Sequence, residues 1–592
     1  MSIFDVLSLL CGLSLFLYGM EVMGNALKKS AGSSLKAILG KMTSNPFKGF
    51  MLGLGVTAVI QSSSATTVMV VGFVNSGTMT LLQAVGVIMG ANVGTAVTAW
   101  ITGLSGLGSA GAAAASFIKW LKPDAWMPIL AVIGIILILF VKRGRKHDIG
   151  EILLGFAVLM VGMSMMSDSV GGLAQNEAFR NILVMFENPI LGVLAGLILT
   201  AIVQSSSASV GILQSLTVTG AITYGAAIPI VMGQNIGTCV TAMISALSAN
   251  TNGKRAAAVH LYFNIIGVVF YLTLFNILNG IFHFEFVHNI IDMWGVAGVH
   301  TIFKILSVIL MAPFYKKLEA LAIKTVKSKK SEEEEDASSL LDERLLDTPA
   351  VAVERSTQVT AMMGELSTGS ILTSLMIYEN YDAKLAEEIR EIENRTDNLE
   401  DALGSYLVKL SAYDMSDSDS AEINKLLHII GDYERIADHA VGIIGTAEEL
   451  RDKKASFSEA AQKEIAVLSK AVGDIVTITH EAFTNNDIIR AGEIEPLEQV
   501  VDELVEQIKR NHVKRLSAGE CTIDLGFILS DLLVCFERVS DHCAHIANCI
   551  IEISEFGALD VHKYNAEHRE GYDNYEHLYS EYKTKYALPA KR

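Results

Sequence analysis

Apolar positions dominate the first half of the chain, and in the second half they recur at helical spacing. Residues 49–118 and 188–253 contain no Asp, Glu, Lys or Arg, as in segments buried in lipid and protein. Long apolar runs predict membrane helices from Ile3 onward and then at 50–78, 81–101, 126–141, 150–167, 190–218, 224–248, 257–279 and 293–313. Six soluble helices are predicted near 350–376, 380–410, 419–453, 457–485, 488–515 and 523–556. The chain is therefore predicted to be all-α.

The charge changes sign between the two halves. Residues 1–330 carry 21 Lys and Arg against 11 Asp and Glu, whereas the remaining residues carry 25 against 53. A membrane region joined to an acidic soluble region explains this difference and excludes fibrous and wholly disordered chains. The first apolar run lacks a basic start and carries Asp5, so it predicts a retained membrane helix, not a signal peptide. The six Cys form no CxxC pair, which is typical of a reducing compartment.

An internal repeat organises the membrane region at an offset of 143 residues. The offset relates two QSSSA segments, which begin at Gln61 and at Gln204. It also relates the segments GANVGT, which begins at Gly90, and GQNIGT, which begins at Gly233. We therefore predict membrane repeat one over 1–142, and repeat two with its following helices over 143–318.

Lysines distinguish the orientation of the two copies. The stretch after the first helix holds Lys28, Lys29, Lys36, Lys41 and Lys48, whereas its counterpart at 171–191 has only Glu177, Arg180 and Glu187 as charged residues. Because Lys and Arg in short loops stay on the cytoplasmic side, the asymmetry favours inverted-topology repeats, which place transport sites near the bilayer midplane.

A helix from Gly49 to Gln61 would rise about 18 Å, so the polar QSSS cluster is predicted near mid-membrane. Each surrounding apolar run is too long for one span and too short for two, which predicts a re-entrant hairpin or broken helix lining a wet cavity. Hydroxyls, amides and free backbone N–H groups suit an anion, and carbonyl oxygens suit Na⁺. The alternative is that these serines only pack helices together.

The GANVGT and GQNIGT segments allow the same two interpretations. Their Asn and Thr side chains offer ligands or donors, while Gly and Thr are also common where membrane helices cross. Polar residues in later apolar segments are interpreted as satisfied interhelical groups: His260, Asn264 and His300.

Paired QSSS motifs, each followed by GxNxGTxxTA, resemble the bacterial form of the type II sodium/phosphate cotransporter family over about residues 1–315. The resemblance implies sodium-coupled movement of inorganic phosphate. It assigns substrate or sodium roles to Gln61, Ser62, Ser63, Ser64, Gln204, Ser205, Ser206 and Ser207, and also to Asn92, Thr95, Asn235 and Thr238. Lys304 departs from the family pattern, since Asn is usual after His-x-x-Phe.

The acidic half contains a second repeat, in which ERIADH from Glu434 returns as ERVSDH from Glu537. The linker 319–349 switches from basic to acidic, and its lysines predict a cytoplasmic C-terminal region. Residues 350–556 resemble a PhoU-like domain of two three-helix bundles. The polar tail 557–592 is predicted to be mobile or to dock elsewhere.

Carboxylates four residues apart share one helix face, so facing pairs can hold a divalent or ferric ion. The candidate ligands are Glu393, Asp397, Glu434, Asp438, Glu498, Asp502, Glu537 and Asp541. The alternative is a solvated acidic face in which Arg435 and Arg538 pair with the acids.

The inverted repeat and the mid-membrane polar clusters predict a transporter, and the family resemblance implies a bacterial cytoplasmic (inner) membrane symporter of phosphate and Na⁺ that works by alternating access and is regulated by its PhoU-like domain. The alternative is a phosphate receptor that signals through that domain without net transport. No P-loop, HExxH or GxSxG motif occurs, so an enzyme is not expected. A homodimer or a phosphate-signalling protein is an expected partner, and nucleic acid is not.

Overall fold

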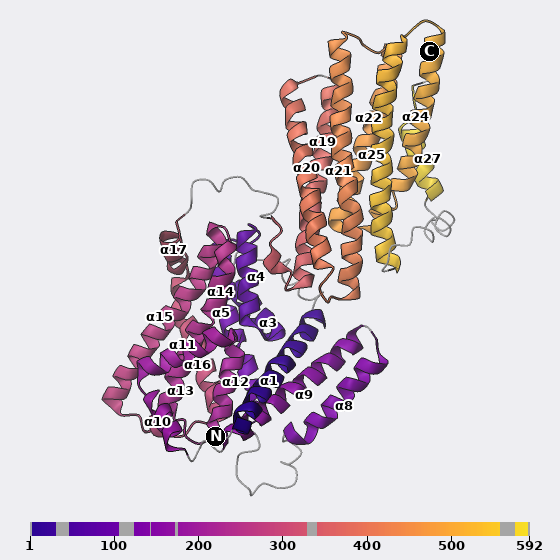
Figure 1. Ribbon diagram of the computed structural model, residues 1–592. Coiled ribbons are helices and arrows are strands. Elements are labelled where there is room, and N and C mark those ends of the chain that lie inside the picture. Colours follow the sequence, from indigo (N-terminus) through magenta and orange to yellow (C-terminus); the bar gives the residue numbers. More distant parts are fainter. Residues whose placement is uncertain are drawn as a thin grey trace. The chain divides into compact units, whose positions relative to one another are not determined.

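The computed structural model describes residues 3–30, 46–105, 123–142, 144–171, 176–327, 340–379, 381–556 and 575–589. Within these ranges the regular elements are helices, and a single isolated bridge pairs Thr223 with Ile290 (Figure 1). The chain forms two compact units, Met1–Val351 and Ala352–Arg592. The all-α prediction is confirmed.

The first unit contains six helices or helix pairs that are long and apolar enough to cross a membrane: Ile3–Ser30, Leu81–Gly103, Arg145–Gly171, Tyr224–Ser248, Thr251–Phe282 and Met293–Thr325. Its helices longer than one turn are α1 (Ile3–Ser30), α3 (Pro46–Ile60), α4 (Ser63–Asn75), α5 (Leu81–Gly94), α6 (Ala96–Gly103), α8 (Pro123–Phe140), α9 (Arg145–Gly171), α10 (Glu177–Met185), α11 (Pro189–Val203), α12 (Ser206–Thr217), α13 (Tyr224–Gly237), α14 (Cys239–Ser245), α15 (Thr251–Phe282), α16 (Met293–Met311) and α17 (Tyr315–Thr325).

The predicted runs 50–78 and 190–218 are each divided into two short helices, α3 with α4 and α11 with α12. A helix of 12 to 15 residues rises only about 20 Å, less than the ~30 Å hydrocarbon core. Each pair therefore has the lengths expected of half-spans.

Glycines bring α3 and α5 into close contact. A Cβ on Gly53 would lie 2.0 Å from the Val87 carbonyl oxygen, and one on Gly90 would lie 1.9 Å from that of Phe50. Gly86 meets the Pro46 carbonyl oxygen and Gly94 meets that of Leu54 in the same way, so residue numbers rise together along the contact. Helices α3 and α5 therefore run parallel, and α4 must run back from the end of α3 to the start of α5. Helices α11 and α13 repeat the arrangement, because Gly196 meets Ile230 in the same way. Both QSSS segments are thus the tips of helical hairpins.

The equivalent helices α1 and α9 pack against each other along their length. A Cβ on Gly12 would meet the Gly162 carbonyl oxygen at 2.9 Å, and one on Gly19 would meet that of Gly155 at 2.6 Å. The early residue of one helix meets the late residue of the other, so α1 and α9 run antiparallel.

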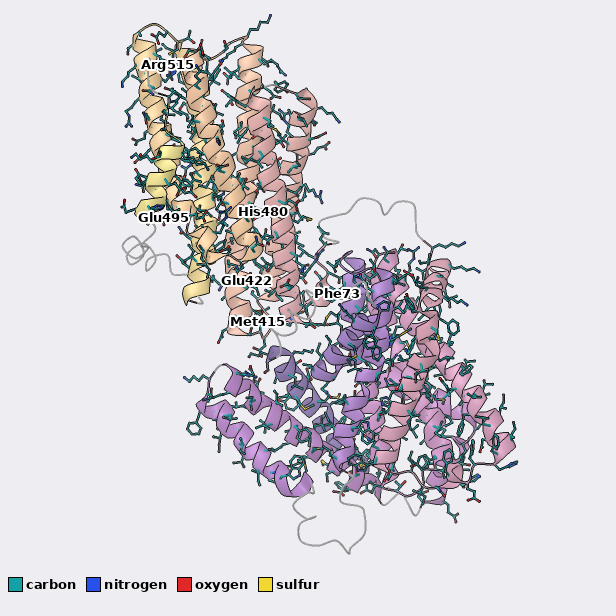
Figure 2. All side chains as sticks on the ribbon, turned by 180° about the vertical axis from the view of Figure 1, so that it is seen from behind. Phe73, Met415, Glu422, His480, Glu495 and Arg515 are labelled. Atoms are coloured by element: carbon teal, nitrogen blue, oxygen red, sulfur yellow. The ribbon has the colours of Figure 1, made fainter. Side chains whose placement is uncertain are left out.

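The second unit is a row of long helices: α19 (Pro349–Glu379, which starts in the first unit), α20 (Ala383–Leu410), α21 (Asp417–Asp452), α22 (Glu459–Asn485), α23 (Ile488–Ala491), α24 (Ile494–Ser517), α25 (Ile523–Phe556) and α27 (Tyr575–Lys585). The six predicted soluble helices are present, with the fifth divided into α23 and α24. A buried ion pair of 2.8 Å joins Arg515 on α24 to Glu464 on α22 (Arg515 is labelled in Figure 2).

Short helical segments lie in the predicted linker and in the predicted tail. In the tail, α27 packs on α24, and the Lys583 ammonium lies 2.9 Å from the Glu503 carboxylate. At the start of the linker, residues 319–325 belong to α17. At its end, a short 3₁₀ helix, η6 (Glu343–Leu345), packs on α4. Parts of the predicted basic loop, the linker and the tail lie outside the described residues: 31–45, 172–175, 328–339, 557–574 and 590–592.

Candidate functional site

The two QSSS segments meet at one cavity of about 300 Å³. The hairpin tips supply eight of its lining residues, and α1 supplies most of the rest. The lining comprises Leu17, Met20, Glu21, Gly24, Asn25, Lys28, Ile60, Gln61, Ser62, Ser63, Ser64, Gln204, Ser205, Ser206 and Ser207. All eight QSSS residues predicted from the sequence are therefore brought together.

Each tip is built by the same local geometry. Gln61 and Gln204 adopt left-handed backbone conformations, with φ of 59° and 55°, which end α3 and α11. Such values are uncommon outside glycine and concentrate at functional sites. The next serine caps the following helix, because the Ser62 hydroxyl accepts a 3.2 Å hydrogen bond from the Ala65 N–H. In the second copy Ser205 does the same at 3.2 Å. The motif thus encodes a helix stop, a reversal and a helix start.

The cavity has the electrostatics of an anion site. The first N–H groups of α4 and α12 have no partner within their helices, and the partial positive charge of both N-termini lies at the tips. Ser63 and Ser206 are buried there and present hydroxyl groups. The Lys28 ammonium also belongs to the lining, where the Glu21 carboxylate offsets its formal charge. Together these groups can donate hydrogen bonds to a small oxyanion.

The two Gln residues differ in their surroundings. Gln61 is buried, and its Oε1 accepts a 2.9 Å hydrogen bond from the Thr98 hydroxyl on α6. Gln204 is exposed. The two tips therefore share a backbone conformation but differ in the side-chain contacts of their Gln residues.

Sequence reasoning missed the contribution of α1. Glu21, Asn25 and Lys28 line the cavity, and the Lys28 ammonium lies 3.5 Å from the Asn25 side-chain oxygen. The repeat offered no signal for them, because the equivalent positions are Ser164, Asp168 and Gly171.

The Asn and Thr residues of the GxNxGT segments do not line this cavity. The Thr95 hydroxyl donates to the Ala91 carbonyl oxygen at 3.1 Å, and Thr238 donates to Gln234 at 3.0 Å, so both stabilise their own helices. Their ligand roles stay predictions.

The two Asn residues have different environments. The Asn235 amide donates to the carbonyl oxygen one turn earlier on α13, at 2.8 Å. The Asn92 amide instead donates to the Asn264 side-chain oxygen at 3.2 Å. The Asn92 side-chain oxygen accepts from the Lys304 ammonium at 3.0 Å. The equivalent positions of the repeat thus have unrelated contacts.

His260 and His300 differ from their prediction as satisfied interhelical groups. Both are buried, yet in the described part of the chain the Nδ1 atom of each has no hydrogen-bond partner. Asn264 does match the prediction, because its amide donates to the His260 carbonyl oxygen at 3.0 Å. A buried polar atom without a partner is costly in a low-dielectric interior, so burial destabilises both rings at these positions.

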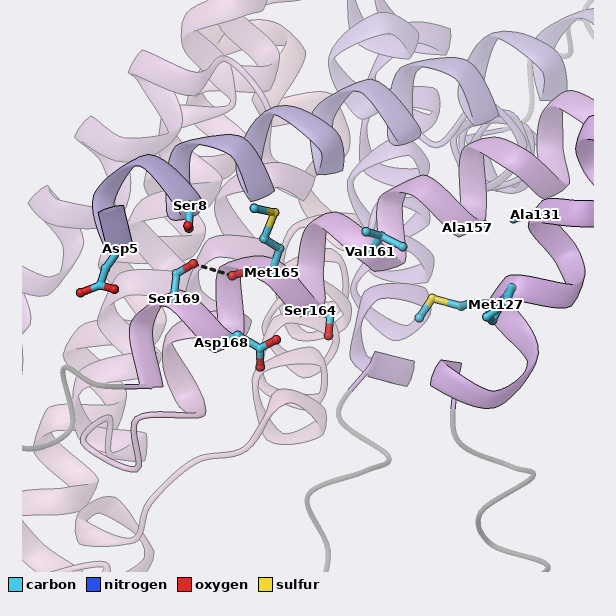
Figure 3. Close-up of a pocket in the computed structure, with 11 residues that line it drawn as sticks. Asp5, Ser8, Met127, Ala131, Ala157, Val161, Ser164, Met165, Asp168 and Ser169 are labelled. Atoms are coloured by element: carbon cyan, nitrogen blue, oxygen red, sulfur yellow. Dashed lines mark hydrogen bonds between the residues drawn. The ribbon is translucent and has the colours of Figure 1, made fainter. Parts of the chain in front are cut away.

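A second cavity, of about 810 Å³, lies between α1, α8 and α9 (Figure 3). Asp5 and Asp168 line it together with apolar side chains such as Met127 and Val161. Among its described lining residues there is no Lys or Arg. Its charge therefore does not suit phosphate.

In the second unit, Glu498, Asp502 and Asp541 offer oxygen atoms that all lie within 4.8 Å of one another. Burial raises the pKa of Asp502 to about 6, and the neighbouring charges of Asp541 and Glu537 add to this. The Asp502 Oδ1 atom is buried and has no hydrogen-bond partner in the described residues. This donor set fits a hard cation. The Arg538 guanidinium lies 3.4 Å from the Asp541 carboxylate. This contact also fits the alternative of an acidic face whose carboxylates pair with arginine.

Of the other predicted carboxylates, Glu537 lies on α25, 3.2 Å from the Lys509 ammonium, and the remaining four lie on α20 and α21. Burial raises the pKa of Glu393, and the charges of Asp438 and Asp397 raise it further. Burial, Asp438 and Asp397 likewise raise the pKa of Glu434. These four carboxylates act on one another electrostatically, but within the described residues they do not form a set as tight as that around Asp502.

The interface of α21 and α25 also holds a cluster that sequence reasoning missed. The Asp432 carboxylate accepts from His542 Nδ1 at 2.9 Å and lies 2.5 Å from His545 Nδ1. The ring of His439 stacks on His542 at 5.8 Å. His439 and His542 are the last residues of the two ERxxDH motifs. The repetition of this motif was therefore the sequence signal for their contact.

Known proteins match both units. The Na⁺/Pi-cotransporter family profile matches residues 15–168 and 158–288, and the PhoU domain profile matches residues 360–446 and 465–550. YjbB of Escherichia coli K12, named for inorganic phosphate export, is 23 % identical over 562 residues, 92 % of this chain and 97 % of YjbB. Human sodium-dependent phosphate transport protein 2B is 37 % identical over 164 residues, 26 % of this chain and 22 % of that protein.

Two further similarities cover less than half of the chain. YqeW of Bacillus subtilis strain 168 is 31 % identical over 268 residues, 45 % of this chain and 81 % of YqeW. The crystal structure of the phosphate transport regulatory protein PhoU from Streptococcus pneumoniae aligns with 36 % of this chain and all of that chain, at 17 % identity and a TM-score of 0.33.

Proposed function

The chain belongs to the Na⁺/Pi-cotransporter family and carries a PhoU domain, and from this premise we propose that it is a sodium-coupled transporter of inorganic phosphate. The observation that carries the proposal is the convergence of both QSSS hairpin tips on one cavity. A pair of serine clusters that only packed helices together would have no reason to share a cavity. The protein is a membrane protein of a transporter family, and no enzymatic activity is proposed.

Phosphate binding is supported by the donors around the cavity. Ser63, Ser206 and the first N–H groups of α4 and α12 reach the anion from two sides, and Lys28 supplies a positive charge. A doubly charged phosphate needs further compensation, because the hairpin regions contain no charged side chain. Sodium ions would supply it, with the Gln61 and Gln204 oxygens and the Glu21 carboxylate as ligands of the kind that Na⁺ prefers.

Alternating access is supported by the antiparallel packing of α1 and α9. Equivalent helices that run in opposite directions are expected of inverted repeats, which exchange roles as the site opens to either side. The lysine-rich stretch after α1 and the lysines of α17 support a cytoplasmic location for that side and for the PhoU domain, in a bacterial inner membrane.

Regulation by the PhoU domain is supported by the segment that leads into it. Residues of η6 pack on α4, the helix that begins at the QSSS tip, and the chain then continues into α19. A displacement of α19 along its axis would therefore act on a helix of the phosphate site. Comparing phosphate flux of the full chain with that of a chain ending at residue 351 tests this, and equal rates under all phosphate concentrations contradict it.

Phosphate flux into proteoliposomes tests the main proposal. Flux should follow an imposed Na⁺ gradient and stop when choline replaces Na⁺. Sodium-independent flux, or binding of phosphate without flux by correctly folded protein, contradicts it, and the latter result favours a receptor that signals through the PhoU domain.

Export is a second candidate direction. It is favoured by the likeness to YjbB, whose name refers to phosphate export and which aligns over almost its whole length. Reversing the Na⁺ gradient in vesicles of known orientation separates the two, because a reversible symporter follows the gradient either way whereas a dedicated exporter moves phosphate only from the PhoU side.

A further inference from the structure

A lysine is buried inside the membrane unit with no carboxylate to balance it. Lys304 on α16 is 2 % exposed, and in the described residues no carboxylate pairs with its ammonium group. Burying a charge in a low-dielectric interior is costly, and a charged side chain inside a membrane is a functional candidate by default. The position therefore requires an explanation beyond packing.

The neighbours of Lys304 form a neutral, oxygen-bearing polar cluster. Its ammonium donates to the Asn92 side-chain oxygen at 3.0 Å, and the Asn92 amide donates to Asn264 at 3.2 Å. The Asn264 amide in turn lies 3.3 Å from the Cys239 sulfur. One turn before Lys304 on the same helix lies buried His300. A cation is thus held by an amide oxygen and surrounded by groups that carry no formal negative charge.

This cluster joins both repeats to the helices that follow them. Asn92 belongs to the GANVGT segment of α5, Cys239 follows the GQNIGT segment, and Lys304 and Asn264 lie on α16 and α15, which pack on α5. Lys304 is not among the residues that line the phosphate cavity, so it does not bind the anion directly. The Lys304 ammonium instead donates to the Asn92 side-chain oxygen. Without this lysine, that oxygen would be free to bind a metal ion.

We propose that the Lys304 ammonium takes the place of one coupling cation, so that this transporter moves one sodium ion fewer per phosphate than a variant with a neutral amide at position 304. The proposal rests on the function proposed above. An amide at position 304 would place its own oxygen beside the Asn92 oxygen, and the two could act together as ligands for Na⁺.

The test compares wild type, Lys304→Asn and Lys304→Arg in proteoliposomes. At a fixed phosphate gradient, the Na⁺ gradient that gives zero net flux yields the number of sodium ions per phosphate. The number of sodium ions per phosphate should be higher by one in Lys304→Asn than in wild type, and one more positive charge should move per cycle. Lys304→Arg keeps the charge and should keep the wild-type ratio.

Equal ratios in wild type and Lys304→Asn would overturn the proposal. Absence of sodium-dependent flux in wild type itself would instead overturn the proposed function, so the two failures are distinct. If Lys304→Asn does not transport, the melting temperature of the purified protein against Na⁺ concentration decides. If the melting temperature of Lys304→Asn rises more steeply with Na⁺ concentration than that of wild type, the proposal is supported. An equal or shallower rise overturns it. Failure of Lys304→Asn to fold in sodium, while Lys304→Arg folds, also overturns it.

Discussion

The Asn75 side chain, at the end of α4, donates a 2.8 Å hydrogen bond to the Asp342 carboxylate, which lies 267 residues further along the chain. Asp342 is buried and also accepts from the Arg344 Nε at 2.7 Å. Arg344 in turn donates to the Ser245 carbonyl oxygen at 3.0 Å. The segment that precedes the PhoU domain is therefore fixed to the same helix whose first turn lines the cavity between the QSSS segments.

Replacing Asp342 by Asn should loosen this segment without unfolding the membrane unit. A hydrogen bond to a charged group contributes about 1.5–3 kcal/mol, which corresponds to roughly 10- to 150-fold in an opening equilibrium. Amide hydrogen exchange over 340–348 should accelerate by that factor in detergent-solubilised protein. Asp347→Asn, an exposed change in the same segment, is the control, and equal acceleration in both variants would contradict the role of Asp342.

Gly53 allows α3 and α5 to touch, and its neighbour Gly55 offers a matched control. A Cβ at Gly53 would lie 2.0 Å from a carbonyl oxygen, whereas one at Gly55 has no neighbour within 4 Å. Gly53→Ala should therefore destabilise the protein by about 1–3 kcal/mol or more through overpacking, while Gly55→Ala should leave it unchanged or slightly stabilised. Thermal unfolding of both variants in the same detergent measures the difference. Equal melting temperatures would show that the helices do not approach this closely.

Filling the cavity should stop transport. Ser63 and Ser206 are buried at the hairpin tips, and a leucine at either position would occupy the space of the anion and remove a donor. We expect phosphate flux to fall by about 100-fold or more for Ser63→Leu and for Ser206→Leu. Ser215→Ala, a buried change on α12 whose hydroxyl donates only to its own helix at 2.8 Å, should keep flux near wild type. Unchanged flux in both leucine variants would remove the site assignment.

The sequence was sufficient to predict the hairpin tips because their chemistry is local. The QSSS letters, the offset of 143 and the apolar run length determine where α3 stops and α4 starts. Contacts between distant segments had no such signal. Lys28 served only as a marker of orientation, yet it lines the cavity. The pairing of Lys304 with Asn92 spans 212 residues and has no counterpart in the repeat, so only the packed structure places them together.

Asp502 should contribute to metal binding in the PhoU domain. Its unpartnered oxygen and the nearby Glu498 and Asp541 provide three carboxylates for a divalent or ferric ion. In equilibrium dialysis of chelator-treated full-length protein, Asp502→Asn should weaken Mn²⁺ binding by about tenfold or more, about 1.4 kcal/mol. Asp531→Asn, an exposed change on α25, is the control. Equal binding by both variants and wild type would leave the cluster as a solvated acidic face.

Docking of the C-terminal helix α27 should depend on Asp474. The Lys585 ammonium lies 2.8 Å from this carboxylate, and the buried Tyr586 hydroxyl also donates to it. Burial alone would raise the pKa of Asp474, but the hydrogen bonds from Lys585 and Tyr586 hold it below the ordinary value of 3.8. A lowered pKa in the folded state means that the stabilisation is complete above pH 3.8 and is lost as the pH falls through the folded-state pKa.

Asp474→Asn should therefore release α27 at neutral pH. Limited proteolysis of the full-length protein at pH 7 should cleave within 575–589 faster in Asp474→Asn than in wild type, and an acid-stable protease should reduce the difference as the pH falls below 3.8. Asp531→Asn again serves as the control, because that exposed carboxylate does not contact α27. A difference between wild type and Asp474→Asn that stays constant from pH 7 to pH 3 would show that the ionised carboxylate does not hold the tail.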